Sequence, residues 1–200
     1  MSGSAAAAAM RLTALGDSLT AGFGLPAEAA FPARLEAALR RRGHAVAIAN
    51  AGVSGDTTAG GLARLKAVIA DKPDGVILEL GTNDALMGLP PARVRDRLAA
   101  MLTRLAEAGI PVLLCGARDL GGHDAAYAAA FAAIYPGLAQ RFRVVLDPFF
   151  LDGAFGHPEL FQADGLHPNA AGVDAIVARL TPVAETFLAR IGAAAAPTAP

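Results

Sequence analysis

The segment Asp164-Gly165-Leu166-His167-Pro168, near the end of the chain, places a carboxylate three residues before an imidazole. A carboxylate that accepts a hydrogen bond from one ring nitrogen fixes the tautomer, so the other nitrogen can act as a general base. One short loop is enough to hold such a pair, because it needs little long-range positioning. The same five residues could equally form a solvated turn. The pair therefore predicts acid–base chemistry only if a nucleophile lies beside it.

A candidate nucleophile is Ser18, in the segment Gly16-Asp17-Ser18-Leu19-Thr20. The segment directly follows an apolar run that we predict to be the first strand. A serine at the change from strand to helix exposes its hydroxyl above the sheet, near backbone N–H groups that can bind an anion. Asp and Ser are also favoured helix caps, so the segment alone is equally typical of a cap. The G-x-S-x-G elbow of α/β-hydrolases is absent around Ser18, so that larger fold is not indicated.

Two further segments follow predicted strands and contain candidate donors to an oxyanion. Gly52, in the stretch from Asn50 to Thr58, could offer a backbone N–H where no side chain fits. Asn83, in Gly81-Thr82-Asn83-Asp84, could donate through its side-chain NH₂ group. Each segment alone is typical of a turn or a helix cap. The set of nucleophile, donors and base, in this order, predicts acyl transfer.

The elements that must position these residues alternate between short apolar runs and longer runs with helical spacing, which predicts an α/β domain. We predict a three-layer α/β/α sandwich with a five-stranded parallel sheet, in the flavodoxin-like strand order 2-1-3-4-5. Catalytic residues then belong at the carboxyl ends of the strands. The expected strands are 12–15, 45–48, 76–80, 112–115 and 144–146, and the expected helices are about 27–42, 57–70, 91–108, 124–141 and 169–190.

Together the four segments resemble the blocks of the SGNH hydrolases, also called the GDSL family, which supply Ser, Gly, Asn and His. The resemblance extends from Leu12 to about Leu188. Within that family, the chain is similar in particular to the arylesterase and multifunctional thioesterase I branch, through the segments 61–65, 131–136 and 147–150. Thr82 departs from that branch, whose members often have a second glycine there, and a β-branched residue stiffens the backbone beside Asn83. The departure weakens the case for thioesterase activity.

The resemblance implies an SGNH hydrolase fold and a serine esterase that cleaves aryl or acyl esters through an acyl-serine intermediate. Acyl thioesters and lysophospholipids are further candidate substrates. It implies Ser18, His167 and Asp164 as the catalytic residues, and Ser18, Gly52 and Asn83 as the oxyanion hole. No cofactor and no metal are expected. Asp17 and Asp84 are expected to brace their own turns through backbone hydrogen bonds.

Apolar residues in the loops predict a pocket for the acyl chain, although ordinary loop packing is the alternative. These residues are Leu86, Met87, Leu89, Leu120, Phe161 and Leu166. The segment from Asp84 to Pro90 is predicted to be a movable wall of this pocket, because flexible Gly88 meets the rigid pair Pro90-Pro91 there.

Two other functions stay open. A carbohydrate acetylesterase of the same superfamily would use the same triad in a more polar, open site. A non-catalytic flavodoxin-like binding domain would share the fold without the chemistry. Such a domain has no need for Ser18, Asn83 and His167 together.

Composition limits the remaining possibilities. The chain has 200 residues, a formal net charge of −1 and no long block of like charges, so nucleic acid is not an expected partner. The spacing of four histidines and one cysteine, Cys115, does not fit a zinc site, and Cys115 is expected in the core. Every apolar run is too short to span a membrane. The expected partner is a small acyl ester, and the oligomeric state is left open.

We predict a single domain over 10–191, a disordered leader over 1–9 and a flexible tail over 192–200. The leader is Ala-rich without a basic start, unlike a secretory signal. A cytoplasmic location is therefore expected, or a periplasmic or secreted one if a leader is missing from the sequence.

Overall fold

A single sheet of five parallel strands forms the centre of the protein, whose computed structural model describes residues 9–195. The strand order is β2-β1-β3-β4-β5, which confirms the predicted 2-1-3-4-5 arrangement. Gly16 at the end of β1 pairs with Gly52 of β2 and with Glu79 of β3, so these three strands end level with one another. The strands are β1 (Met10–Gly16), β2 (Val46–Gly52), β3 (Gly75–Glu79), β4 (Val112–Cys115) and β5 (Val145–Asp147).

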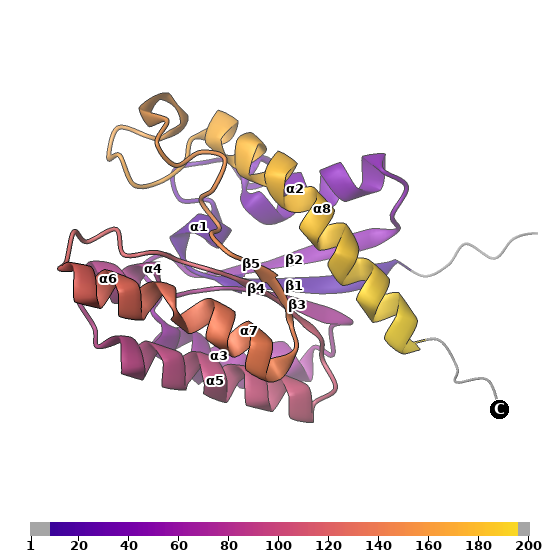
Figure 1. The fold of residues 1–200 in the computed structure, drawn as a ribbon. Helices are drawn as coiled ribbons and strands as arrows, with labels where there is room; N and C mark the ends of the chain where they lie inside the picture. The colour runs from indigo at the N-terminus through magenta and orange to yellow at the C-terminus, as the bar shows by residue number, and fades with distance from the viewer. Residues whose placement is uncertain (1–8, 196–200) are drawn as a thin grey trace, which may run out of the picture.

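Helices cover both faces of the sheet (Figure 1). The helices α2 (Phe31–Arg41) and α8 (Ala170–Ala195) pack on each other over one face. The opposite face is covered by α3 (Thr58–Ala70), α5 (Pro91–Glu107), α6 (Ala125–Ala132) and α7 (Ile134–Phe142). Two short helices, α1 (Ser18–Ala21) and α4 (Thr82–Leu86), directly follow β1 and β3. The predicted three-layer sandwich is confirmed.

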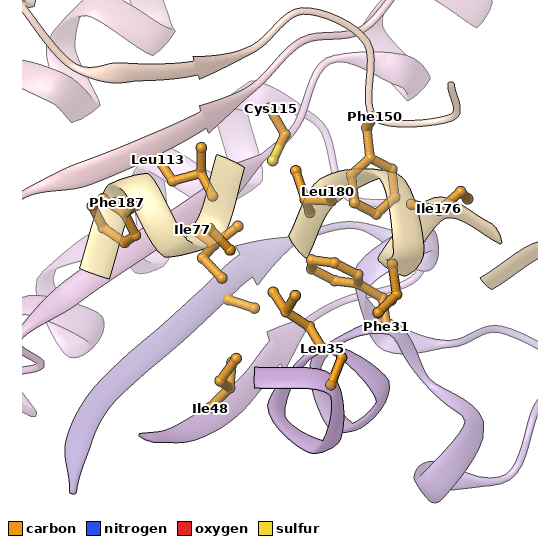
Figure 2. Close-up of a cluster of buried hydrophobic side chains, with 14 of the residues drawn as sticks. Phe31, Leu35, Ile48, Ile77, Leu113, Cys115, Phe150, Ile176, Leu180 and Phe187 are labelled. Carbon is orange, nitrogen blue, oxygen red and sulfur yellow. The ribbon is translucent and has the colours of Figure 1, made fainter. Parts of the chain in front are cut away.

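Apolar side chains fill both interlayer spaces. In the layer beneath α2 and α8, Phe31 and Leu35 of α2 meet Leu180 and Phe187 of α8 over the strand residue Ile77 (Figure 2). All five residues of β3 are buried, as expected of a central parallel strand with helices on both faces. Cys115 is 1% exposed and belongs to the same cluster, in agreement with its predicted place in the core.

Two of the expected helices are interrupted. The region expected as a helix over 27–42 contains a 3₁₀ turn, η1 (Ala27–Ala29), and then α2, because Ala30 is extended. The region expected over 124–141 divides at Ala133 into α6 and α7. Pro136, in the first turn of α7, has no N–H to donate to the carbonyl of residue 132, so one continuous ladder cannot form there.

The last helix is longer than predicted, because α8 continues to Ala195. Residues 192–195, expected in the flexible tail, are therefore helical. The remaining tail residues 196–200 and the leader residues 1–8 lie outside the described part of the chain. None of the helices between residues 9 and 195 combines the length and apolar character that crossing a lipid bilayer requires.

Candidate active site

Three side chains from two segments that are distant in the sequence form one hydrogen-bonded chain at the carboxyl end of the sheet. Ser18 begins α1, and its Oγ lies 2.9 Å from Nε2 of His167. Nδ1 of His167 lies 2.7 Å from Oδ2 of Asp164. The predicted nucleophile, base and orienting carboxylate therefore meet at hydrogen-bonding distances, which is the arrangement that nucleophilic catalysis requires.

The loop that carries Asp164 and His167 is held by its own hydrogen bonds. The carboxylate accepts from the backbone N–H groups of Leu166 at 2.9 Å and His167 at 3.0 Å. These bonds, together with the one from the imidazole, lower the pKa of Asp164 to about 2. Asp164 is therefore ionised at any pH where the protein would be assayed, and it favours the tautomer with hydrogen on Nδ1.

We expect activity to fall on acidification, because only a neutral imidazole of His167 can accept the proton of Ser18. Asp164 keeps its charge down to its lowered pKa, so it adds no second inflection between pH 4 and 8. The measurement is kcat/KM for a neutral ester from pH 5 to 9, with circular dichroism to show that the protein stays folded. A flat profile through pH 5 would remove His167 from the general-base role.

Phe23, which was not among the predicted site residues, packs against the imidazole of His167. Phe23 lies 4.5 Å from His167 between ring centroids, although 49% of Phe23 is exposed. Gln162 joins the two loops, because its Nε2 donates to the carbonyl of Phe23 at 2.7 Å and to that of Pro168 at 3.1 Å. An aromatic residue between two glycines, directly after the serine block, was the sequence signal that could have identified Phe23.

Gly52 has no room for a side chain, as predicted. A Cβ at this position would lie 2.2 Å from the backbone nitrogen of Ala21, because β2 passes directly beneath α1. Its N–H, however, donates to Oδ1 of Asn50 at 2.9 Å. Gly52 is thus placed next to the serine block, with its donor satisfied inside the protein.

Asn83 lies in the first turn of α4, where the sequence predicted only a turn. Its Nδ2 donates to the carbonyl of Asp56 at 2.8 Å and to Oδ2 of Asp17 at 3.2 Å. Both hydrogens of the amide therefore have acceptors. The N–H of Ser18, by contrast, has no acceptor among the described residues. A developing oxyanion would meet the Ser18 N–H first and would compete with Asp17 for Asn83.

Two buried carboxyl groups lie beneath the serine. Asp17 and Glu79 are both almost fully inaccessible, and Thr20 donates its hydroxyl to Glu79 at 2.8 Å. Burial raises the pKa of Asp17 to about 7 and the pKa of Glu79 well above its usual value. The pair therefore does not carry two negative charges at neutral pH. Two such charges would repel an oxyanion formed nearby.

Asp17 and Asp84, which were both expected to brace their own turns, accept hydrogen bonds from different parts of the chain. Oδ1 of Asp17 accepts from the N–H of Leu19 at 2.9 Å, which caps α1. The carboxylate of Asp84 instead accepts from the backbone N–H of Thr58 at 2.8 Å and from its hydroxyl at 2.6 Å. Asp84 thus holds the start of α3, so its predicted role within its own turn is wrong.

An apolar groove of about 460 Å³ lies against the loop that carries Asp164 and His167. Three of the predicted pocket residues, Leu120, Phe161 and Leu166, line it. Its other walls come from residues that the sequence did not indicate, namely Leu151, Phe155, Gly156, His157, Pro158 and Gly165. The groove is therefore assembled from three loops, after β4, after β5 and before α8.

The segment from Asp84 to Pro90, which the sequence predicted as a movable wall of the acyl pocket, does not line this groove. Leu86 ends α4, Met87 is 67% exposed, and neither lines the groove. Leu89 packs against the opposite core, and its carbonyl accepts a hydrogen bond from Tyr127 Oη at 2.9 Å. The role of Leu86 and Met87 in acyl binding, and the movement of this segment, stay predictions.

In the part of the chain that the structure describes, no three His, Cys, Asp or Glu side chains are grouped so as to hold a metal ion.

Comparison with known proteins agrees with this geometry. Residues 14–175 match the model of the GDSL-like lipase/acylhydrolase family. The chain is 38% identical to "Esterase TesA" of Pseudomonas aeruginosa over 183 residues, which is 91% of both proteins. It is 40% identical to an "Arylesterase" of Vibrio mimicus over 166 residues, 82% of this chain and 83% of that protein. A crystal structure of TesA superposes with a TM-score of 0.84 at 36% identity, over 89% of this chain and 99% of the other. The chain therefore belongs to the GDSL-like lipase/acylhydrolase family and is a carboxylic ester hydrolase of that family.

Proposed function

We propose that the protein hydrolyses esters of apolar carboxylic acids through an acyl-serine intermediate on Ser18. The observation that carries this proposal is the continuous chain from Ser18 Oγ through His167 to Asp164, together with an apolar groove lined by Gly165 and Leu166 of the same loop. The relatives named esterase and arylesterase support the same class of substrate.

In the acylation step, Ser18 Oγ attacks the carbonyl carbon while Nε2 of His167 takes the hydroxyl proton. The carbonyl oxygen becomes an anion, which the N–H of Ser18 stabilises. The N–H of Gly52 and the amide of Asn83 join it by giving up their acceptors Asn50 and Asp17. When the C–O bond to the alcohol breaks, His167 gives the proton to the leaving oxygen. Water then repeats the sequence on the acyl-serine, which releases the acid and restores the serine.

An activated ester tests this scheme directly. Mixing the protein with a nitrophenyl ester should give a burst of about one nitrophenol per protein molecule, if release of the acyl group is slower than its formation. An organophosphonate should label Ser18 once and abolish turnover. A protein that neither labels nor turns over any ester would be the non-catalytic binding domain instead.

The groove favours an acyl chain over a sugar, because leucine and phenylalanine side chains form most of its walls. We expect the double variant Leu120→Ala, Phe155→Ala to lose about tenfold or more in kcat/KM on octanoate esters, since each buried methylene is worth up to about 0.8 kcal/mol. Acetate esters, which do not reach these residues, should keep nearly their parent rate. The measurement compares nitrophenyl acetate and octanoate.

The double variant Leu86→Ala, Met87→Ala is the matched control, because it truncates two apolar residues outside the groove. A selective loss on octanoate there would add the end of α4 to the acyl site, as the sequence predicted. Equal losses on acetate and octanoate in the groove variant would contradict the proposed acyl site, because uniform damage reports a disturbed triad.

A further inference from the structure

Arg64 of α3 has no part in the mechanism described above, yet its guanidinium binds at the base of the site. Nε donates to Oδ2 of Asp56 at 2.7 Å, Nη1 to the carbonyl of Ala51 at 2.6 Å, and Nη2 to the carbonyl of Gly16 at 2.7 Å. All three nitrogens of the planar group are thus used on three separate oxygens.

Each of these oxygens belongs to a segment that carries a candidate catalytic group. Gly16 ends β1 two residues before Ser18, and Ala51 directly precedes Gly52. Asp56 follows in the turn before α3, and its carbonyl accepts the 2.8 Å hydrogen bond from Asn83 Nδ2. Arg64 therefore connects the segments of the nucleophile and of both other predicted oxyanion donors, through two backbone carbonyls and the carboxylate of Asp56.

The residues around Arg64 leave space for its ion pair with Asp56 and partly shield it from solvent. The side chain of Arg64 is 25% exposed and that of Asp56 is 11% exposed, so little solvent screens the ion pair. A Cβ on Gly60 would lie 1.7 Å from Oδ1 of Asp56, so only glycine leaves space for the carboxylate. A lysine ammonium is a single point charge and cannot reproduce the fork of donors.

We propose that Arg64 is a positioning residue that sets the distance between Ser18 and the donors Gly52 and Asn83 for the transition state of ester cleavage. This inference rests on the proposed function. Catalysis by positioned donors is sensitive to displacements of about 1 Å, which can cost about 100-fold in rate. The acyl groove is built by other loops, so substrate binding does not depend on Arg64. Loss of Arg64 therefore lowers kcat and leaves KM nearly unchanged.

The test uses Arg64→Lys and Arg64→Ala, each measured on a nitrophenyl acetate and normalised to the folded fraction. We expect kcat to fall about 10- to 100-fold in both, with KM within about twofold of the parent. Because Arg64→Lys keeps the charge beside Asp56, its loss of rate would assign the effect to the fork of hydrogen bonds. Millimolar guanidinium chloride should partly restore kcat in Arg64→Ala and leave the parent unchanged.

Arg179→Ala is the matched control. Arg179 of α8 is 23% exposed and binds Asp147 and the carbonyls of Asp152, Phe149 and Phe150. Arg179→Ala should lower the melting temperature at least as much as Arg64→Ala does. Its kcat on the acetate ester should stay within about twofold of the parent. If Arg64→Ala does not fold, Arg64→Lys and Asp56→Asn apply the same test.

Unchanged kcat in folded Arg64→Lys and Arg64→Ala would overturn the proposal. So would an equal loss of kcat in Arg179→Ala, or a failure of guanidinium to restore any rate. These outcomes are distinct from failure of the proposed function, which would appear as ester turnover that persists after Ser18 is replaced.

Discussion

Ser18→Ala will leave a folded protein that turns over nitrophenyl esters about 10⁴- to 10⁶-fold more slowly than the parent, the range seen when the serine of such triads is removed. The substitution removes the Oγ that lies 2.9 Å from His167 Nε2 and leaves Asp17 in place as the cap of α1. The fold should therefore change little, because only one small hydroxyl is lost. The measurement is kcat/KM on nitrophenyl acetate, with circular dichroism and thermal unfolding as checks on folding.

Ser54→Ala is the control, because Ser54 is an exposed serine in the turn after β2. It should keep the parent rate and still be labelled by an organophosphonate, whereas Ser18→Ala should not be labelled. Turnover by Ser18→Ala at close to the parent rate would refute the acyl-serine mechanism.

Asp164→Asn should lower kcat about 10²- to 10⁴-fold with little effect on stability, as replacement of the orienting aspartate does in serine hydrolases. One oxygen of the side chain can still accept from the backbone of Leu166 and His167. The new NH₂ group, however, faces Nδ1 of the imidazole and favours hydrogen on Nε2. In that tautomer His167 cannot accept the proton of Ser18. The measurement is kcat/KM at pH 8.

A second aspartate–histidine pair in the same chain provides a matched control. Asp119 accepts from Nδ1 of His123 at 2.9 Å, and from the backbone N–H groups of Gly121 at 2.9 Å and His123 at 3.0 Å. Among the described residues, Nε2 of His123 has no hydrogen bond to a hydroxyl and lies near Gly88, and the Tyr127 hydroxyl donates instead to the carbonyl of Leu89. Asp119→Asn should therefore leave kcat within about twofold of the parent. An Asp164→Asn protein as active as Asp119→Asn would show that Asp164 does not orient the base.

The amino-acid sequence alone determined the layers of the fold and the order of the strands. Continuous apolar runs such as Val112–Cys115 are typical of strands buried between two helical layers. Parallel strands joined by right-handed crossovers leave few possible strand orders. Local signals also identified Ser18, because it directly follows the first strand, and Asp164 with His167, because the two lie three residues apart in one loop. Their roles in catalysis stay predictions until the variants above are measured.

Helix ends were predicted less accurately than the strand order, because a proline or a short turn can end a helix where the helical spacing of apolar residues continues. The helical pattern continues through Ala133, and only the geometry of the chain around Pro136 shows the division into α6 and α7. Similarly, Gly81 to Asp84 has the composition of a turn but begins the helix α4. A single helical turn is stabilised by its neighbours rather than by its own propensity.

Only the tertiary structure decided which apolar loop residues form the groove and how near the predicted base His167 lies to Ser18. Leu120, Phe155 and Phe161 lie in different loops, so their common wall depends on how the ends of β4, β5 and α8 are placed. Asp119 with His123 and Asp164 with His167 make similar local hydrogen bonds, although the first pair is four residues apart and the second three. The serine that distinguishes them is 149 positions from His167, and long-range packing alone brings it there.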